Sequence, residues 1–127
     1  MKAEMEADMH ETALMKNLIT TIEQVLEGRN VTQVNQVSIS VGQLSNALPE
    51  ALSFAFEAMT QEGFLKGAKL VIENLPAVAR CEICGREYQV DKFPLICPDC
   101  SSTSFTIISG EEVYIQSIDC EEKWIND

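Results

Sequence analysis

Two Cys-x-x-Cys pairs constrain the fold of this chain more than any other feature of its sequence. Cys81 and Cys84 form the first pair, twelve residues follow, and Cys97 and Cys100 form the second. Each pair predicts a tight turn that directs two sulfur atoms to one side, with backbone N–H groups aimed at them. Two such turns facing each other supply four thiolates to a tetrahedral Zn²⁺ ion. We therefore expect a zinc ribbon, with Gly85 in a left-handed turn after the first pair.

Other interpretations of the four cysteines are open at this stage. Tetrahedral sulfur sites also bind iron, and the segments CEICGREY and CPDC resemble the two metal-binding turns of rubredoxins. The short loop between the pairs and the few aromatic residues around it favour zinc. Disulfides are disfavoured because the N-terminus lacks the apolar segment of a signal peptide, so the cytoplasm is the expected compartment. Protein sulfurs fill all four positions, so the zinc is expected to be structural, with no open position for a substrate.

The charge balance excludes several classes of partner. The chain has 20 Asp and Glu against 9 Lys and Arg, a formal charge of −11. Neutralising phosphates takes a basic face, so we expect neither a nucleic-acid binder nor a protein that docks on anionic membranes. No apolar run is long enough to span a bilayer.

No feature of the sequence predicts an enzyme. We find no catalytic triad, no phosphate-binding loop and no paired buried carboxylates. The fifth cysteine, Cys120, would need a base to act as a nucleophile, and the single histidine, His10, is far away in the sequence. Cys120 is therefore expected to be an ordinary, partly buried thiol.

Hydrophobic periodicity predicts two helices. The first is expected to run from an N-cap at Asp8 to a C-terminal Gly28, and the second from Pro49 to Gly63. The apolar face of the first consists of Leu14, Met15, Leu18, Ile19, Ile22, Val25 and Leu26. The apolar face of the second consists of Leu52, Ala55, Phe56 and Met59.

The remaining patterns predict strands and complete an α+β fold. Period-two alternation indicates a strand over 31–41, and 69–75 reads as another, so strand, helix and strand form a parallel β–α–β unit. Residues 105–109, a turn at Gly110 and residues 113–119 read as a terminal hairpin. We expect two helices on a small three-stranded mixed sheet, with an inserted zinc-ribbon module held by four cysteines. The predicted parts are a disordered extension over 1–8, an α/β lobe over 9–76 and 108–120, the ribbon lobe over 77–107 and an acidic tail over 121–127.

Met9, His10 and Glu11 stand at the opening of the first predicted helix. A histidine there is most often only a solvated side chain. The positive end of the helix dipole keeps the imidazole neutral, which is the form that binds a metal. The residues alone leave both roles open.

Five segments, in order along the chain, resemble one known family. They are MHE at the helix start, VSISVGQLSNALPEALSFAFE, KGAKLVIENLPAVARCEICG, CPDC and GEEVYIQSID. From Met9 to about Trp124 the chain is similar to the HypA/HybF family of hydrogenase maturation factors. The resemblance implies a nickel metallochaperone that delivers Ni²⁺ to the immature large subunit of [NiFe]-hydrogenase. It also implies a HypB-type GTPase as partner and, as in some relatives, urease maturation proteins.

The resemblance implies a nickel site at Met9, His10 and Glu11. In the family the histidine acts with the chain's own amino terminus, an intervening backbone amide and nearby carboxylate or amide groups. An α-amine, an amide nitrogen and an imidazole on adjacent residues form fused chelate rings, which give the planar nitrogen field that Ni²⁺ favours. Glu50, near the start of the second predicted helix, is a further candidate.

The position of the histidine departs from the family pattern. Family members begin with Met-His-Glu, whereas the histidine here is the tenth residue. Met1, Met5 and Met9 are all candidate initiators. If Met1 is the first residue of the protein, the amine ligand is missing, and we expect weaker nickel binding through His10, Glu11 and Asp8.

Two other functions compete with nickel delivery. A zinc-ribbon protein-interaction adaptor without a nickel role explains the ribbon and the acidity equally well, but leaves Met-His-Glu unexplained. A rubredoxin-like electron carrier would require iron at the four cysteines.

Overall fold

The structure, a computed structural model, describes residues 2–91 and 93–122, with the side chains from His10 onward. The predictions for the Met9 side chain and for the tail beyond Glu122, including Trp124, lie outside this part. The division of the chain into the predicted lobes, with an extension over 1–8, stays a prediction.

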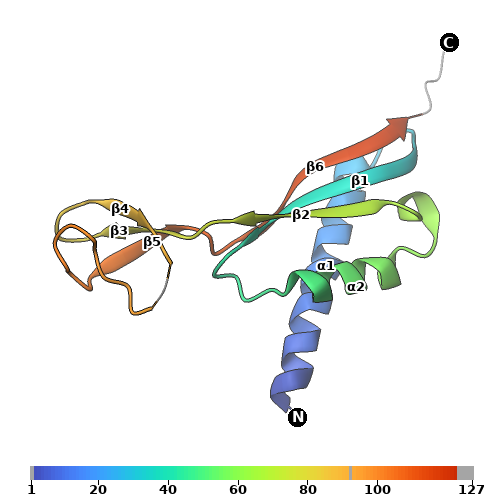
Figure 1. Cartoon of the computed structure of the whole chain (residues 1–127). Helices are drawn as coiled ribbons and strands as arrows, with labels where there is room; N and C mark the ends of the chain where they lie inside the picture. The colour runs from blue at the N-terminus through green and yellow to red at the C-terminus, as the bar shows by residue number, and fades with distance from the viewer. Residues whose placement is uncertain (1, 92, 123–127) are drawn as a thin grey trace. The chain divides into compact units, whose positions relative to one another are not determined.

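A mixed sheet with two helices forms the larger part of the fold. The sheet has the strand order β2-β1-β6. Strands β1 and β2 run in the same direction and β6 runs in the opposite one (Figure 1). The parallel β–α–β unit and the mixed sheet predicted from the sequence are therefore confirmed. The elements are α1 (Lys2–Leu26), β1 (Val31–Gly42), α2 (Pro49–Met59), the 3₁₀ helix η1 (Gly63–Leu65), β2 (Lys69–Leu75) and β6 (Val113–Glu122).

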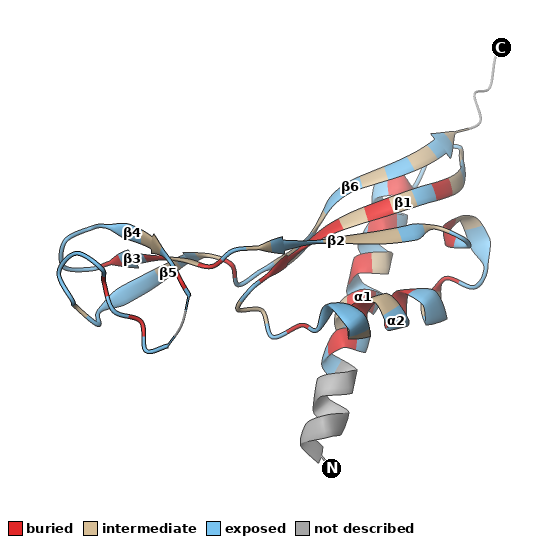
Figure 2. Ribbon diagram, viewed as in Figure 1, coloured by how far each residue is buried: buried red, intermediate tan, exposed pale blue. Residues whose placement is uncertain are grey.

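The buried face of α1 contains one residue that the apolar pattern did not include. Glu11 is buried at the head of this face, whereas Val25 is 55% exposed, so its predicted place in the core is wrong. Leu26 takes the place four residues after Ile22, and this turns Val25 to solvent. Figure 2 shows buried segments on α1, β1 and α2. The buried residues of these three elements in this unit include Met15, Leu18, Ile22, Leu26, Val34, Val37, Ile39, Leu52, Ala55 and Phe56.

Two predicted helix boundaries are wrong. Helix α1 begins well before Asp8, so Asp8 is not its N-cap. Helix α2 ends at Met59, where Thr60 is the C-cap and its Oγ1 donates to the carbonyl of Phe56 at 2.7 Å. Gly63, expected to end α2, has a φ of 85° and opens η1 instead.

A second three-stranded sheet surrounds the cysteines. It consists of β3 (Val78–Cys81), β4 (Glu87–Gln89) and β5 (Phe105–Ser109) in the order β4-β3-β5, with both pairs antiparallel. The sequence predicted no strands over β3 and β4, because their short segments lack a clear period. Buried residues of this sheet and the segments next to it form a small core: Ala77, Ala79, Val90 and Leu95, with Leu44, Tyr88 and Ile107 packed against it.

The predicted hairpin of residues 105–109 and 113–119 is wrong. Strand β5 pairs with β3, whereas β6 belongs to the other sheet. Between them Gly110, with a φ of 100°, lies against Ala77, and its carbonyl accepts the N–H of Leu44 at 2.7 Å. The chain therefore passes from one sheet to the next at Gly110 and does not turn back on itself.

The chain divides into two compact units. The first consists of Met1–Ile39, Ala47–Glu73 and Tyr114–Asp127, and the second of Ser40–Asn46 and Asn74–Val113. Within the second unit the side-chain amide of Gln43 donates to the carbonyl of Val90 at 3.0 Å and accepts the N–H of Ala77 at 2.9 Å. Among residues 2–91 and 93–122, no helix is both long and apolar enough to cross a bilayer.

Candidate metal centres

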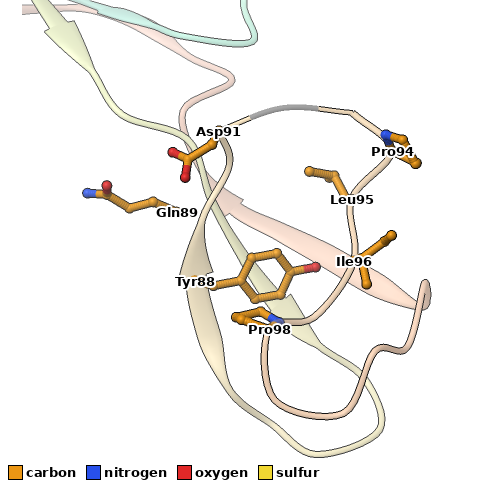
Figure 3. Close-up of a pocket in the computed structure, with 7 residues that line it drawn as sticks. All are labelled: Tyr88, Gln89, Asp91, Pro94, Leu95, Ile96 and Pro98. Atoms are coloured by element: carbon orange, nitrogen blue, oxygen red, sulfur yellow. The ribbon is translucent and has the colours of Figure 1, made fainter.

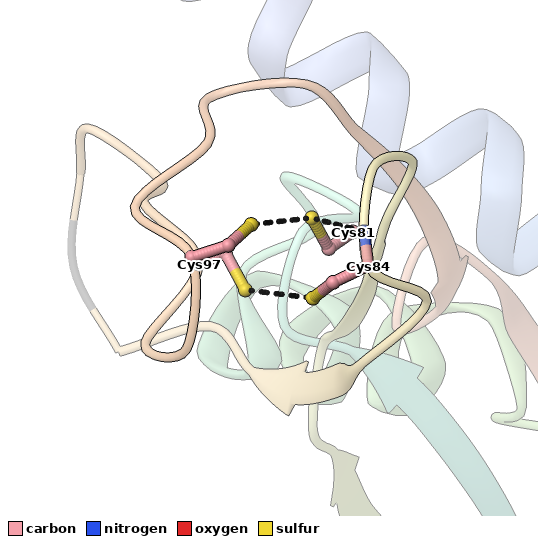
Figure 4. A group of neighbouring side chains, drawn as sticks. Cys81, Cys84 and Cys97 are labelled. Carbon is pink, nitrogen blue, oxygen red and sulfur yellow. Dashed lines mark hydrogen bonds between the residues drawn. The ribbon is translucent and has the colours of Figure 1, made fainter.

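The four cysteines of the two Cys-x-x-Cys pairs converge on one point. Their sulfur atoms all lie within 4.8 Å of one another. Across the pairs, Cys81 Sγ lies 3.4 Å from Cys100 Sγ, and Cys84 Sγ lies 3.6 Å from Cys97 Sγ. Figure 4 shows the two turns facing each other across this gap. Four sulfurs about 2.3 Å from a tetrahedral Zn²⁺ ion lie about 3.8 Å apart, so the donor set fits such an ion.

Backbone N–H groups donate to sulfurs of both pairs, as the sequence predicted. Ile83 and Cys84 donate to Cys81 Sγ at 3.4 and 3.5 Å, and Asp99 donates to Cys97 Sγ at 3.4 Å. Such bonds stabilise thiolates, the form that binds a metal.

The same bonds set the pKa values of the thiols. The N–H groups of Cys84 and Ile83 lower the pKa of Cys81 to about 6, although burial opposes this shift. At Cys100 the N–H of Ser102 acts to lower the pKa, but the hydrogen bond with Cys81 and burial outweigh it and raise the pKa to about 12. Because a metal ion binds the deprotonated form of cysteine, binding at this group would displace the protons that remain on its sulfurs.

Both turns have the same backbone shape, but the residue with a left-handed backbone conformation is a glycine in the first turn and a serine in the second. The N–H of Gly85 donates to the carbonyl of Cys81 at 3.0 Å, and the N–H of Ser101 donates to that of Cys97 at 2.9 Å. Gly85 has a φ of 82° and Ser101 a φ of 63°. The sequence predicted the left-handed glycine, but not the strained serine, because serine is not a residue that marks such a turn. An ion pair between Arg86 and Asp99 at 2.7 Å also joins the two turns.

Substitutions at these two equivalent positions should have opposite effects. Nothing lies within 4 Å of a Cβ added at Gly85, so Gly85→Ala creates no steric clash. Alanine is strained in the left-handed backbone conformation, so the substitution should destabilise the ribbon by about 1 kcal/mol. Ser101→Gly should be stabilising by a few tenths to about 1 kcal/mol, because the relief of strain exceeds the added entropy of the unfolded chain. Denaturant titration of the metal-loaded protein measures both. A Gly85→Ala variant as stable as the wild type would contradict the argument.

A shallow pocket of about 250 Å³ lies on the ribbon and contains none of the predicted site residues. Tyr88 Oη is buried there without a hydrogen-bond partner among the described residues, and burial raises the pKa of Tyr88. Figure 3 shows the lining residues: Tyr88, Gln89, Asp91, Pro94, Leu95, Ile96 and Pro98.

The described residues of the predicted nickel site differ in exposure. His10 is exposed on α1, and Glu50 is exposed in the first turn of α2. Glu11 is buried, and its Oε2 accepts the N–H of Leu48 at 2.9 Å. Over the described residues, the four cysteines are the single group of three or more His, Cys, Asp or Glu side chains close enough to hold a metal. Cys120 is not a member of this group and is half-buried on β6.

The fold and the site define a two-unit α+β protein with four clustered cysteines that form a zinc-ribbon-like site. The model of one family, described as "Hydrogenase/urease nickel incorporation, metallochaperone, hypA", matches residues 9–120. The chain therefore belongs to the HypA family, a non-catalytic family of metallochaperones that act in hydrogenase maturation.

The sequences of two curated relatives align with this chain along their whole length. The hydrogenase maturation factor HypA of Desulfitobacterium hafniense is 40% identical over 114 residues, which cover 90% of this chain and 100% of the relative. That of Geobacter metallireducens is 34% identical over 113 residues, covering 89% and 100%.

Two solved structures share the fold. The solution structure of the Ni metallochaperone HypA from Helicobacter pylori has a TM-score of 0.66 at 19% identity and covers 89% of this chain and 98% of its own. A second solution structure, of a HypA protein, has a TM-score of 0.69 at 22% identity, covering 91% and 98%.

Proposed function

We propose that this protein delivers Ni²⁺ to the immature large subunit of [NiFe]-hydrogenase and holds a separate structural zinc ion at its four cysteines. The observation that carries the proposal is the family match over residues 9–120, which includes both Met-His-Glu and the two cysteine pairs. A HypB-type GTPase and the hydrogenase large-subunit precursor are the proposed partners. Urease maturation proteins are included because the family description names urease.

The two metal centres suit different tasks. Four protein sulfurs complete the coordination of a tetrahedral ion, so the ribbon retains its metal and serves the fold. The exposed imidazole of His10 is accessible for metal uptake and release. The proposed nickel site comprises Met9, His10 and Glu11.

Zinc and iron at the ribbon are distinguished by colour and metal content. Iron(III) bound by four thiolates gives a red protein, whereas a zinc-loaded protein is colourless. We expect a colourless purified protein with one zinc per chain by elemental analysis. A red protein would support the electron-carrier alternative.

Replacing His10 by alanine should abolish specific nickel binding and leave the fold intact. Loss of the single imidazole removes the strongest neutral nitrogen donor, so nickel affinity should fall by at least about a hundredfold. Competition titration with Ni²⁺ measures this loss, and zinc content serves as the control for the ribbon. Equal affinities of the variant and the wild type would contradict the nickel function. Mass analysis of the native amino terminus identifies which methionine carries the α-amine.

An adaptor without a nickel role has one observation in its favour. Ile83 is 69% exposed, Phe93 is 68% exposed and Ile96 is 50% exposed, all on the ribbon. Exposed apolar side chains are typical of protein-binding surfaces. A wild-type protein that binds nickel no better than His10→Ala, yet still captures hydrogenase maturation proteins, would favour the adaptor.

A further inference from the structure

Glu11 is held inside the protein although it follows the exposed His10. Its side chain is only 3% exposed. Glutamate is almost never buried to this extent without a partner. Glu11 heads the buried stripe of α1 that continues at Met15, Leu18, Ile22 and Leu26. This stripe fixes the rotation of α1 about its axis, with Glu11 inside and His10 in solvent.

The partner of the Glu11 carboxylate is the backbone at the start of α2. The N–H of Leu48 donates to Glu11 Oε2 at 2.9 Å. Leu48 is the N-cap of α2, and its side chain makes no capping hydrogen bond. Capping positions favour Ser, Thr, Asp or Asn, and negative charge is favourable at a helix N-terminus. Glu11 therefore accepts from α1 the N–H of the N-cap residue, the role that a glutamate at the third helical position takes in a capping box, and α2 has Ala51 at that position.

This arrangement is incompatible with a nickel ligand at the same oxygen. To reach a metal ion in solvent beside His10, the carboxylate would have to leave the interior and release Leu48. The bond that joins α1 to the start of α2 would then be lost. The first turn of α2, which carries Glu50, would lose this bond to α1.

We infer that Glu11 is a positioning residue of the nickel site and not a ligand through its carboxylate. The inference rests on the proposed nickel function. Glu11 fixes the start of α1 against α2 and so determines where the imidazole of His10 is presented.

Four variants separate positioning from coordination. Glu11→Gln keeps an oxygen that can accept the Leu48 N–H, whereas Glu11→Ala removes the acceptor. Leu48→Pro removes the donor and leaves the Glu11 carboxylate intact, and the φ of −90° at Leu48 is near the range of proline. Glu23→Gln removes an exposed carboxylate of α1 and serves as the matched control. The measurements are nickel affinity by competition titration, the ligand-field absorption spectrum at nickel saturation, and hydrogen exchange of the Leu48 amide.

We expect Glu11→Gln and Glu23→Gln to bind nickel within about threefold of the wild type, and Glu11→Ala and Leu48→Pro about tenfold more weakly. The spectrum at saturation should be the same in all variants, because the ligands are unchanged. Exchange at Leu48 should be faster in Glu11→Ala than in Glu11→Gln.

Other results would overturn the inference. A shifted spectrum in Glu11→Gln, with an affinity as low as that of Glu11→Ala, would make the carboxylate a ligand. Wild-type affinity in both Glu11→Ala and Leu48→Pro would remove the positioning role. A wild-type protein that binds no nickel would instead refute the proposed function. If Glu11→Ala fails to fold, judged by its helix content and zinc stoichiometry, Glu11→Gln and Leu48→Pro still decide between the two roles.

Discussion

Replacing Cys97 by alanine is expected to unfold the ribbon while the helices of the other unit persist. Cys97 is 1% exposed, and its sulfur lies 3.6 Å from that of Cys84. Removal of one of four ligands forfeits much of the folding free energy that structural zinc supplies, about 10–16 kcal/mol in zinc-finger peptides near neutral pH. The ribbon core of two alanines, one valine and one leucine is too small to replace it.

The measurement is zinc stoichiometry together with the amide NMR spectrum. Cys97→Ala should lose the zinc and the dispersed resonances of β3, β4 and β5, whereas those of α1 and α2 remain. Cys120→Ala is the matched control, because Cys120 lies outside the group of four sulfurs, and it should retain one zinc per chain. Full zinc occupancy in Cys97→Ala would show that the ligand set is wrong.

Replacing Gly42 by alanine is expected to be nearly as disruptive, for a steric reason. A Cβ at Gly42 would overlap the carbonyl oxygen and carbon of Gly110 and the nitrogen of Glu111. All three are backbone atoms, so no side chain can move aside. Backbone hydrogen bonds join the same two segments, from the N–H of Gly42 to the carbonyl of Glu112 and from the N–H of Leu44 to the carbonyl of Gly110, both at 2.7 Å. We expect a loss of about 3 kcal/mol or more in the free energy of unfolding.

Chemical denaturation of the metal-loaded protein measures this loss. Gly28→Ala is the control, because Gly28 has a φ of 83° but nothing within 4 Å of its added Cβ. It should lose only about 1 kcal/mol, the cost of the left-handed backbone. A Gly42→Ala variant no less stable than Gly28→Ala would mean that the end of β1 and residues 110–112 move apart at little cost in free energy.

The sequence predicted best those features that depend on neighbouring residues. The spacing within the two cysteine pairs predicts the sulfur cluster, because each turn is local. The strand over 69–75 matches β2, and the second helix begins at Pro49 as expected. The hairpin failed because the partner of β5 is β3, far away in the sequence, and a local turn signal at Gly110 carries no information about such pairing.

The candidate nickel residues show a different limit. The nickel ligand set stays a prediction, but Met-His-Glu as a sequence motif does not show which of its side chains are buried, because adjacent residues on a helix do not face the same way. Glu11 stands four residues before Met15 and shares its buried face. The four-residue spacing of Glu11 and Met15 can be read from the sequence. The usual expectation that charged residues lie outside the core argues against placing Glu11 on the buried face. Its bond to Leu48 spans 37 residues and could be found only from the fold.

The side chain of Gln43 has a consequence for how the second unit folds. Its side-chain amide accepts and donates hydrogen bonds as a backbone peptide group would. The bond to Ala77 closes a loop of 34 residues, and the bond to Val90 closes one of 47 residues. Each closure carries an entropic cost that a purely local ribbon would avoid. This unit should therefore fold more slowly than an isolated zinc ribbon, because Gln43, just after the end of β1, must first come into contact with Ala77 and Val90. A peptide cut at Asn74 and Val113 would lack Gln43, leaving the N–H of Ala77 and the carbonyl of Val90 without this partner.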